Sequence, residues 1–133
     1  MNSNNIERIK EILSPLKDQY EVVLFGSFIE NATRPTSDID ISVLSRTQDE
    51  AKNIQLQKDL LGQFPLKFDI RVFELFPIYI QISIVQNYIV IFGDPLDISE
   101  YFYHIRKKWD DCKYRILSNQ FSSYHERLSL IKE

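Results

Sequence analysis

Three aspartates in two apolar stretches are the residues of this chain best placed to do chemistry. Asp38 and Asp40 open the apolar run 38–44, and Asp69 lies inside the run 67–73. Residues two apart on a β-strand point to the same face, so Asp38 and Asp40 share one face of a strand. Carboxylates at that spacing bind hard divalent cations, which also relieve the repulsion between like charges. The pair therefore predicts a metal site, which Asp69 joins if its strand lies beside the first.

A Gly-Ser pair ends the preceding apolar run and supplies a candidate phosphate site. Gly26 lets the backbone turn tightly and lets a phosphate come close to it. Ser27 can cap the start of a following helix, whose free N–H groups bind anions. A phosphate site on one strand and paired carboxylates on the next are typical of a protein that handles nucleotides.

The hydrophobic pattern predicts the elements that must position these residues. Strands are expected over about 20–25, 38–44, 67–73 and 88–92. Helices are expected over about 6–14, 27–32, 48–61, 76–86 and 98–116, with a polar interruption at 118–123 and a last short helix over 124–132. In the helix 48–61 the apolar side is formed by Ala51, Ile54, Leu60 and Leu61, and Asp97 with Glu100 resembles a capping arrangement.

This order of elements predicts an α/β fold, a small mixed β-sheet of about four strands flanked by helices. Residues 1–95 would form the core, and residues 96–133 a C-terminal helical extension packed on it, within a single domain overall. A chain of 133 residues is long enough for one such domain.

Composition limits the partners and the compartment. The net charge of −3 and the pI of about 5.4 give no general attraction to nucleic acid or to a membrane surface. The single cysteine, Cys112, cannot form an internal disulfide. With no apolar signal region and no long uninterrupted apolar segment, the expected setting is the cytoplasm.

The Gly26-Ser27 pair, the ten-residue spacing and the Asp38-Ile39-Asp40 sequence together resemble the signature of the minimal nucleotidyltransferases, small members of the polymerase-β-like superfamily. The resemblance covers roughly residues 20–93. One part of the motif differs, because Ile29-Glu30-Asn31 stands where many relatives have Ala-Arg-Gly.

The resemblance implies a core of the nucleotidyltransferase type and a metal-dependent transfer of AMP from ATP, with release of pyrophosphate. Its catalytic and metal-binding residues would be Asp38, Asp40 and Asp69, with two Mg²⁺ ions, and its nucleotide-binding residues would be Gly26, Ser27 and Ser37. Asp69 would position and deprotonate the attacking hydroxyl. Stand-alone proteins that resemble this family are often antitoxins that modify a tyrosine of a HEPN-type ribonuclease toxin, which here would be a separate chain.

Two other functions stay open at this point. One is a nucleotidyltransferase for a small molecule such as an aminoglycoside, although this chain has little room for a second substrate-binding domain. The other is a non-catalytic module of the same fold that neutralises a partner by contact. The acceptor, the base preference and the oligomeric state are not fixed by these residues.

Overall fold

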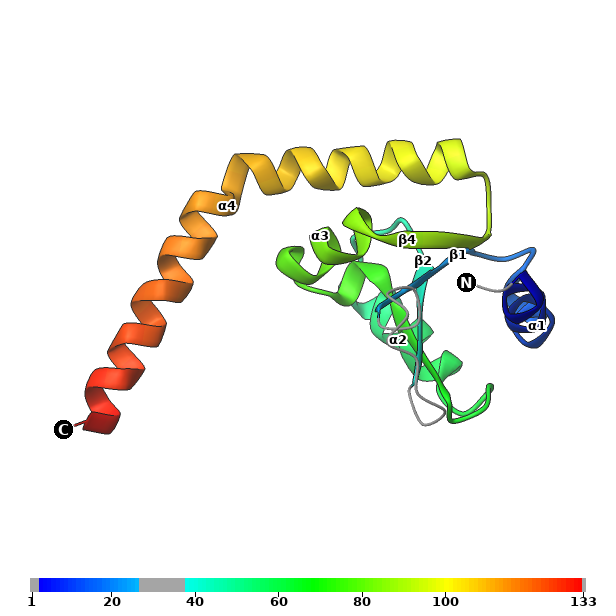
Figure 1. The fold of residues 1–133 in the computed structure, drawn as a ribbon, viewed down its shortest axis with the longest axis horizontal. Helices are drawn as coiled ribbons and strands as arrows, with labels where there is room; N and C mark the ends of the chain where they lie inside the picture. The colour runs from blue at the N-terminus through cyan, green and yellow to red at the C-terminus, as the bar shows by residue number, and fades with distance from the viewer. Residues whose placement is uncertain (1–2, 27–37, 133) are drawn as a thin grey trace.

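The computed structural model of the protein describes residues 3–26 and 38–132, which build one four-stranded sheet with helices on both faces (Figure 1). The helix predicted over 27–32 lies outside the described residues. In chain order the elements are α1 (Ser3–Ile12), η1 (Ser14–Leu16), β1 (Glu21–Phe25), β2 (Ile39–Leu44), α2 (Glu50–Leu60), β3 (Phe68–Val72), η3 (Phe73–Leu75), α3 (Ile78–Gln86), β4 (Tyr88–Phe92) and α4 (Pro95–Lys132).

The sheet has the strand order β3-β2-β1-β4 and is mixed. β1 pairs antiparallel with β2 and with β4, whereas β2 and β3 pair in parallel. Parallel neighbours need a crossover connection, and α2 supplies it. The four predicted strands and the α/β fold class are therefore confirmed, with β3 at one free edge of the sheet.

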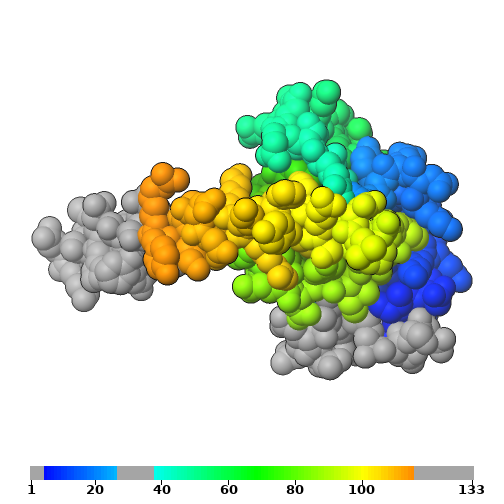
Figure 2. All heavy atoms as spheres, turned by 90° about the horizontal axis from the view of Figure 1, so that it is seen from above, coloured from blue at the N-terminus to red at the C-terminus, as the bar shows by residue number. Residues whose placement is uncertain are grey.

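The period-two pattern of the strands divides the apolar residues between two cores. One core lies between the sheet and the helices α1 and α2, and includes Leu13, Leu24, Ile41 and Leu60. The other lies between the sheet and the helices α3 and α4, and includes Val23, Phe73, Ile84 and Phe102. α4 lies across this second face and extends beyond the rest of the molecule (Figures 1 and 2).

The buried face of α2 differs from the predicted one. Ala51 and Ile54 are exposed, whereas Asn53 is buried together with Leu60. The Asn53 carbonyl oxygen accepts a hydrogen bond from the Ser45 hydroxyl at 2.6 Å. Because this polar partner satisfies the amide, an asparagine occupies a position facing the sheet that apolar spacing alone assigns to the opposite side.

α4 also differs from the prediction. It runs through 118–123 without the interruption expected there. Serine and asparagine lower helix propensity by less than about 0.7 kcal/mol per residue, which is too little to end a helix that continues on both sides. Its N-terminal cap is Asp94, whose carboxylate accepts a hydrogen bond from the Leu96 N–H at 2.9 Å, rather than Asp97. Within the described part of the chain, no helix is both long and apolar enough to cross a membrane.

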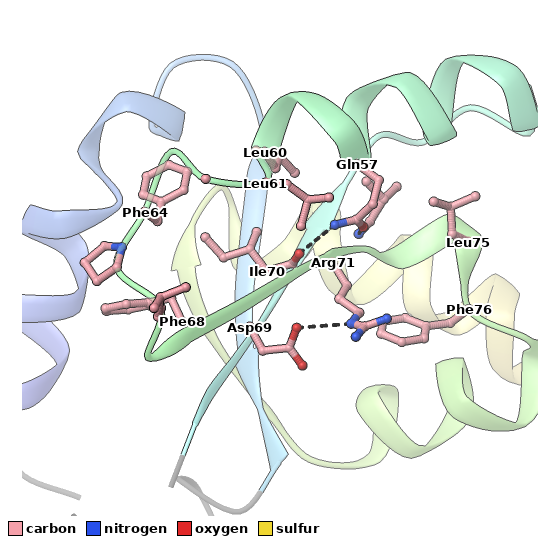
Figure 3. Close-up of a pocket in the computed structure, with 14 residues that line it drawn as sticks. Gln57, Leu60, Leu61, Phe64, Phe68, Asp69, Ile70, Arg71, Leu75 and Phe76 are labelled. Carbon is pink, nitrogen blue, oxygen red and sulfur yellow. Dashed lines mark hydrogen bonds and ion pairs between the residues drawn. The ribbon is translucent and has the colours of Figure 1, made fainter. Parts of the chain in front are cut away.

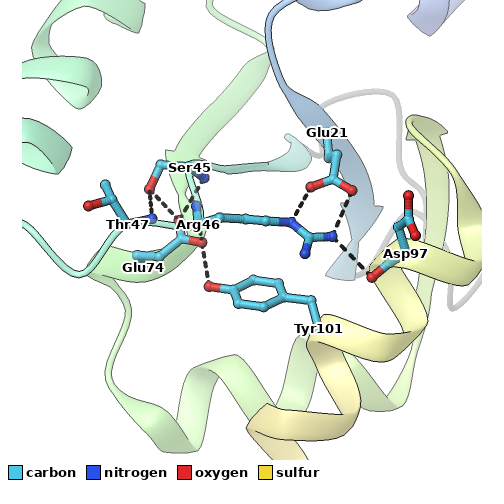
Figure 4. Close-up of polar contacts among 7 residues, drawn as sticks. All are labelled: Glu21, Ser45, Arg46, Thr47, Glu74, Asp97 and Tyr101. Atoms are coloured by element: carbon cyan, nitrogen blue, oxygen red, sulfur yellow. Dashed lines mark hydrogen bonds and ion pairs between the residues drawn. The ribbon is translucent and has the colours of Figure 1, made fainter.

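A polar network joins the end of β2 to the first turns of α4 (Figure 4). Glu74 of η3 accepts hydrogen bonds from the backbone N–H groups of Ser45 and Arg46, at 2.9 and 3.0 Å. It also accepts one from the Tyr101 hydroxyl at 2.6 Å. The Arg46 guanidinium pairs with Glu21 of β1 at 2.5 Å and lies over the Tyr101 ring. These contacts fix α4 against the sheet.

The substitution Tyr101→Phe should lower the free energy of unfolding by about 2 kcal/mol, because it removes a hydrogen bond to a charged group. Denaturant unfolding measures the loss. Tyr103→Phe is the matched control, since Tyr103 lies on the same helix and is exposed, and its effect should be close to zero. Equal effects of the two substitutions would contradict a stabilising role for the Glu74 contact.

Candidate active site

The register of the sheet brings two of the three candidate aspartates together. Asp40 on β2 lies directly opposite Asp69 on β3. Asp38 immediately precedes β2 and is exposed. Aligned residues of neighbouring strands point to the same face, so the carboxylates of Asp40 and Asp69 face the side of the sheet that α3 and α4 cover. Residues 29 positions apart in the sequence thus form one acidic cluster.

The electrostatics of the cluster centre on Asp40. Burial raises the pKa of the Asp40 carboxyl above its ordinary value, and the negative charges of Asp69 and Asp38 raise it further. The positive charge of Arg71 acts in the opposite direction. The carboxylates of Asp69 and Asp38 are therefore close enough to Asp40 to affect whether its carboxyl is ionised.

Arg71 is a member of this site that the sequence analysis did not identify. Its Nε donates to Asp69 Oδ1 at 3.1 Å (Figure 3). Arg71 stands two positions after Asp69 on β3, so the two side chains share a face. The sequence signal for Arg71 is its two-residue spacing from Asp69 along an otherwise apolar strand, which predicts that the two side chains share a face.

Ser42 is a second group that the sequence analysis missed. It follows Asp40 at the strand spacing of two residues, is fully buried, and its hydroxyl has no hydrogen-bond partner among the described residues. The sequence signal for Ser42 is that it follows Asp38 and Asp40 at the same two-residue spacing in an otherwise apolar stretch. Ser42 therefore lies on the same face of β2 as Asp40, two residues further along the strand.

Gly26 closes the other side of the cluster. It follows Phe25, which lies opposite Asp40 in the β1–β2 register. Gly26 has φ +85°, and a Cβ atom added there would collide with the Asp40 carboxylate. Only glycine therefore allows the backbone to approach Asp40 this closely. The other two predicted nucleotide-binding residues, Ser27 and Ser37, lie outside the described residues.

The substitution Gly26→Ala should lower the free energy of unfolding by more than the backbone cost alone. That cost is about 1–2 kcal/mol for a residue other than glycine in the left-handed region. Gly62→Ala is the matched control, because Gly62 has φ +81° with no atom within 4 Å of the added Cβ. Thermal or denaturant unfolding compares the two. Equal losses would show that the contact between Gly26 and Asp40 is not tight.

The chemistry of the cluster suits a divalent cation. All three groups are carboxylates, the ligands that Mg²⁺ prefers. The pKa of Asp40 is raised by burial and then by the charges of Asp69 and Asp38, and a bound cation would oppose both effects by stabilising the ionised carboxylate. Within 3–26 and 38–132, however, no three acidic, histidine or cysteine side chains already converge at metal-binding geometry. Asp69 is instead paired with Arg71. The donor set fits Mg²⁺, and one oxygen of Asp69, Oδ1, is bound by Arg71.

Comparison with known proteins shows which sequence family this chain matches. The family described as Polymerase beta, Nucleotidyltransferase matches residues 7–95, a range that contains Gly26 and all three aspartates. The chain is also similar to a Methanocaldococcus jannaschii protein that carries the provisional name protein adenylyltransferase. The two are 40% identical over 111 residues, which cover 84% of this chain and 86% of that protein.

Solved structures share the fold at low sequence identity. A chain from a crystal structure of a toxin–antitoxin with AMP-PNP superposes with a TM-score of 0.68 at 18% identity, covering 90% of this chain and 98% of that chain. A chain from the complex of the tri-AMPylated Shewanella oneidensis HEPN toxin with MNT antitoxin gives a TM-score of 0.63 at 18% identity, covering 93% and 99%. At this identity the likeness concerns the fold alone.

Proposed function

Because the chain belongs to the polymerase beta nucleotidyltransferase family, we propose that it transfers AMP from ATP to a hydroxyl group of a separate protein. The observation that carries the proposal is the strand register, which sets Asp40 opposite Asp69, with Asp38 immediately before the strand that holds Asp40. The name of the Methanocaldococcus jannaschii relative, protein adenylyltransferase, supports a protein as the acceptor.

In this proposal Asp38 and Asp40 would hold two Mg²⁺ ions, with Asp69 as a further ligand. When bound, Mg²⁺ neutralises the charge of a triphosphate and favours departure of pyrophosphate. The backbone at Gly26 would hold the β- and γ-phosphates together with Ser27, and Ser37 would also contact the nucleotide. The close packing of Gly26 on Asp40 supports this role, because it brings the Gly26 backbone directly beside a carboxylate of the proposed cation site.

Asp69 would act on the acceptor. Its carboxylate accepts the hydroxyl proton while the hydroxyl oxygen forms a bond to the α-phosphorus of ATP. The bond between the α-phosphorus and the oxygen that bridges to the β-phosphate breaks, and pyrophosphate leaves with that electron pair. Asp69 is only partly buried, which leaves it accessible to a hydroxyl on another protein.

The acceptor in this proposal is a tyrosine of a HEPN-type toxin, with the present chain as its antitoxin. The support is the fold likeness to a chain from a complex of a HEPN toxin, AMPylated in that structure, with MNT antitoxin. One second candidate is a module that neutralises its partner by contact alone. The ion pair between Asp69 and Arg71 favours this candidate, because the carboxylate that is proposed to accept the proton is already bound to Arg71.

An experiment with labelled ATP separates the two candidates. The protein is incubated with Mg²⁺ and a lysate of its own source cells, in parallel with ATP labelled at the α-phosphate and at the γ-phosphate. Transfer of AMP predicts a discrete protein band that carries the α-label but not the γ-label. A band that carries the γ-label but not the α-label would indicate phosphorylation, and label on RNA or a small molecule would reject a protein acceptor. No label in any fraction, with a partner retained on immobilised protein, would favour the contact module.

A further inference from the structure

A groove of about 440 Å³ runs along the free edge of β3 and reaches Asp69 (Figure 3). One wall comes from the end of α2 and the loop after it, where Leu61 and Leu66 are 67% and 100% exposed. The other wall contains Asp69, Arg71 and Phe76. Figure 3 shows β3 crossing between the two walls. The groove thus joins an exposed apolar surface to the acidic cluster.

The hydrogen bonding of β3 shows what shape of ligand the edge accepts. The Gln57 side chain donates to the Ile70 carbonyl at 2.8 Å and accepts from the Val72 N–H at 2.8 Å. These are the two bonds that one residue of an added parallel strand would make. The Phe68 N–H is bonded to the Pro65 carbonyl. The next outward pair along β3, the Phe68 carbonyl and the Ile70 N–H, is therefore where a backbone can be added.

A segment that pairs there must be extended, and its side chains alternate between the two walls. A side chain on one face meets Asp69 and Phe76, and the next residue meets the apolar wall at Leu61. An aromatic ring against Phe76 places a phenolic hydroxyl near Asp69. In a parallel alignment, the residue two positions after this tyrosine stands opposite Arg71, where its backbone replaces the Gln57 amide on the Ile70 carbonyl and the Val72 N–H.

The charges of the groove select the class of ligand. Among the residues that the structure describes, Arg71 is the one cationic residue that lines the groove and Asp69 the one anionic residue. RNA requires several cations along its backbone, and a polycationic aminoglycoside would need more anionic lining groups than Asp69 alone. An apolar groove with one cation and one carboxylate suits a peptide segment instead.

We propose that this groove binds an extended segment of the acceptor protein with its tyrosine beside Asp69. Apolar residues flank the tyrosine and contact the wall at Leu61, and an acidic residue two positions after it pairs with Arg71. The inference rests on the proposed transfer of AMP to a protein hydroxyl and names the subsite that selects the acceptor.

The first test uses synthetic ten-residue peptides with the central sequence Val-Tyr-Val-Asp, α-labelled ATP and the full chain. We expect label on this peptide and none on its Tyr→Phe version. Replacing both valines by lysine, or the aspartate by lysine, should lower labelling about 10-fold or more, the scale of losing one apolar or polar contact in a binding site. Labelling that is equal for all tyrosine peptides would overturn the proposal.

The second test changes the groove and uses the labelled acceptor band from the lysate. Leu61→Asp and Leu66→Asp should lower its labelling about 10-fold or more, and both side chains are exposed enough to change without unfolding. Leu96→Asp is the matched control, because Leu96 is 79% exposed at the start of α4, outside the groove. If the Leu61 and Leu66 variants label the band like wild type, the groove is rejected and AMP transfer stands. If wild type labels no protein, the proposed function itself fails.

Discussion

The double substitution Asp38→Asn with Asp40→Asn should lower the transfer of AMP at least about 100-fold, the scale on which groups that support a bound metal act. Asparagine keeps the size of aspartate and removes its charge, so the cation site loses two ligands while the sheet keeps its packing. Initial rates with α-labelled ATP and the labelled acceptor measure the loss. The double substitution Asp110→Asn with Asp111→Asn is the matched control, because both carboxylates are exposed on α4.

The same double substitution should not destabilise the fold. The folded-state pKa of Asp40 is raised by burial, then by Asp69 and Asp38. A carboxyl with a raised pKa adds stability below its unfolded pKa and loses that contribution as the pH rises through the folded value. Without divalent cations, the wild type should therefore lose more stability between pH 4 and neutrality than the variant does.

Two results would contradict the assignment of these carboxylates. A double variant that transfers AMP as well as wild type would exclude Asp38 and Asp40 as essential cation ligands. A variant that unfolds during purification would show that Asp40 is needed for the fold, contrary to its raised pKa. The unfolding curves and the labelling assay use the same preparation, so the two outcomes are read separately.

The strands of this fold follow directly from the sequence. The predicted strand Tyr88–Phe92 has the same bounds as β4. This short apolar run is bounded by Asn87 and Gly93 and shows no helical spacing that would compete with a strand. The neighbouring positions of Asp40 and Asp69 also follow, because strands joined by one crossover helix commonly lie side by side. The position of Asp40 beside Asp69 could therefore be predicted from the sequence.

The details that the sequence did not reveal depend on partners distant in the chain. Asn53 is buried because Ser45 bonds it, and Gln57 meets β3 because its amide reaches two backbone groups. Hydrophobic periodicity treats Asn53 and Gln57 as polar residues and therefore predicts that both face the solvent. Arg71 differs, because its two-residue spacing from Asp69 does predict a shared face, but the spacing does not show that the two side chains form an ion pair.

The substitution Asp69→Asn should lower AMP transfer about 10²- to 10⁴-fold, the usual contribution of a general base. It should leave stability nearly unchanged, because the pair with Arg71 has side chains that are 59% and 41% exposed for Arg71 and Asp69. Exposed pairs contribute about 0–1 kcal/mol and are screened by salt. The measurement is a labelling rate together with an unfolding curve.

The binding of ATP with Mg²⁺ distinguishes the roles of the aspartates. A ligand at 100 times its Kd stabilises the folded state by about 2.7 kcal/mol. In Asp69→Asn this stabilisation should persist, because Asp38 and Asp40 still hold the cation that neutralises the triphosphate. In the double variant it should disappear. If Asp69→Asn also abolished the stabilisation by ATP with Mg²⁺, Asp69 would act mainly as a cation ligand, and the proton acceptor would have to be sought elsewhere in the site.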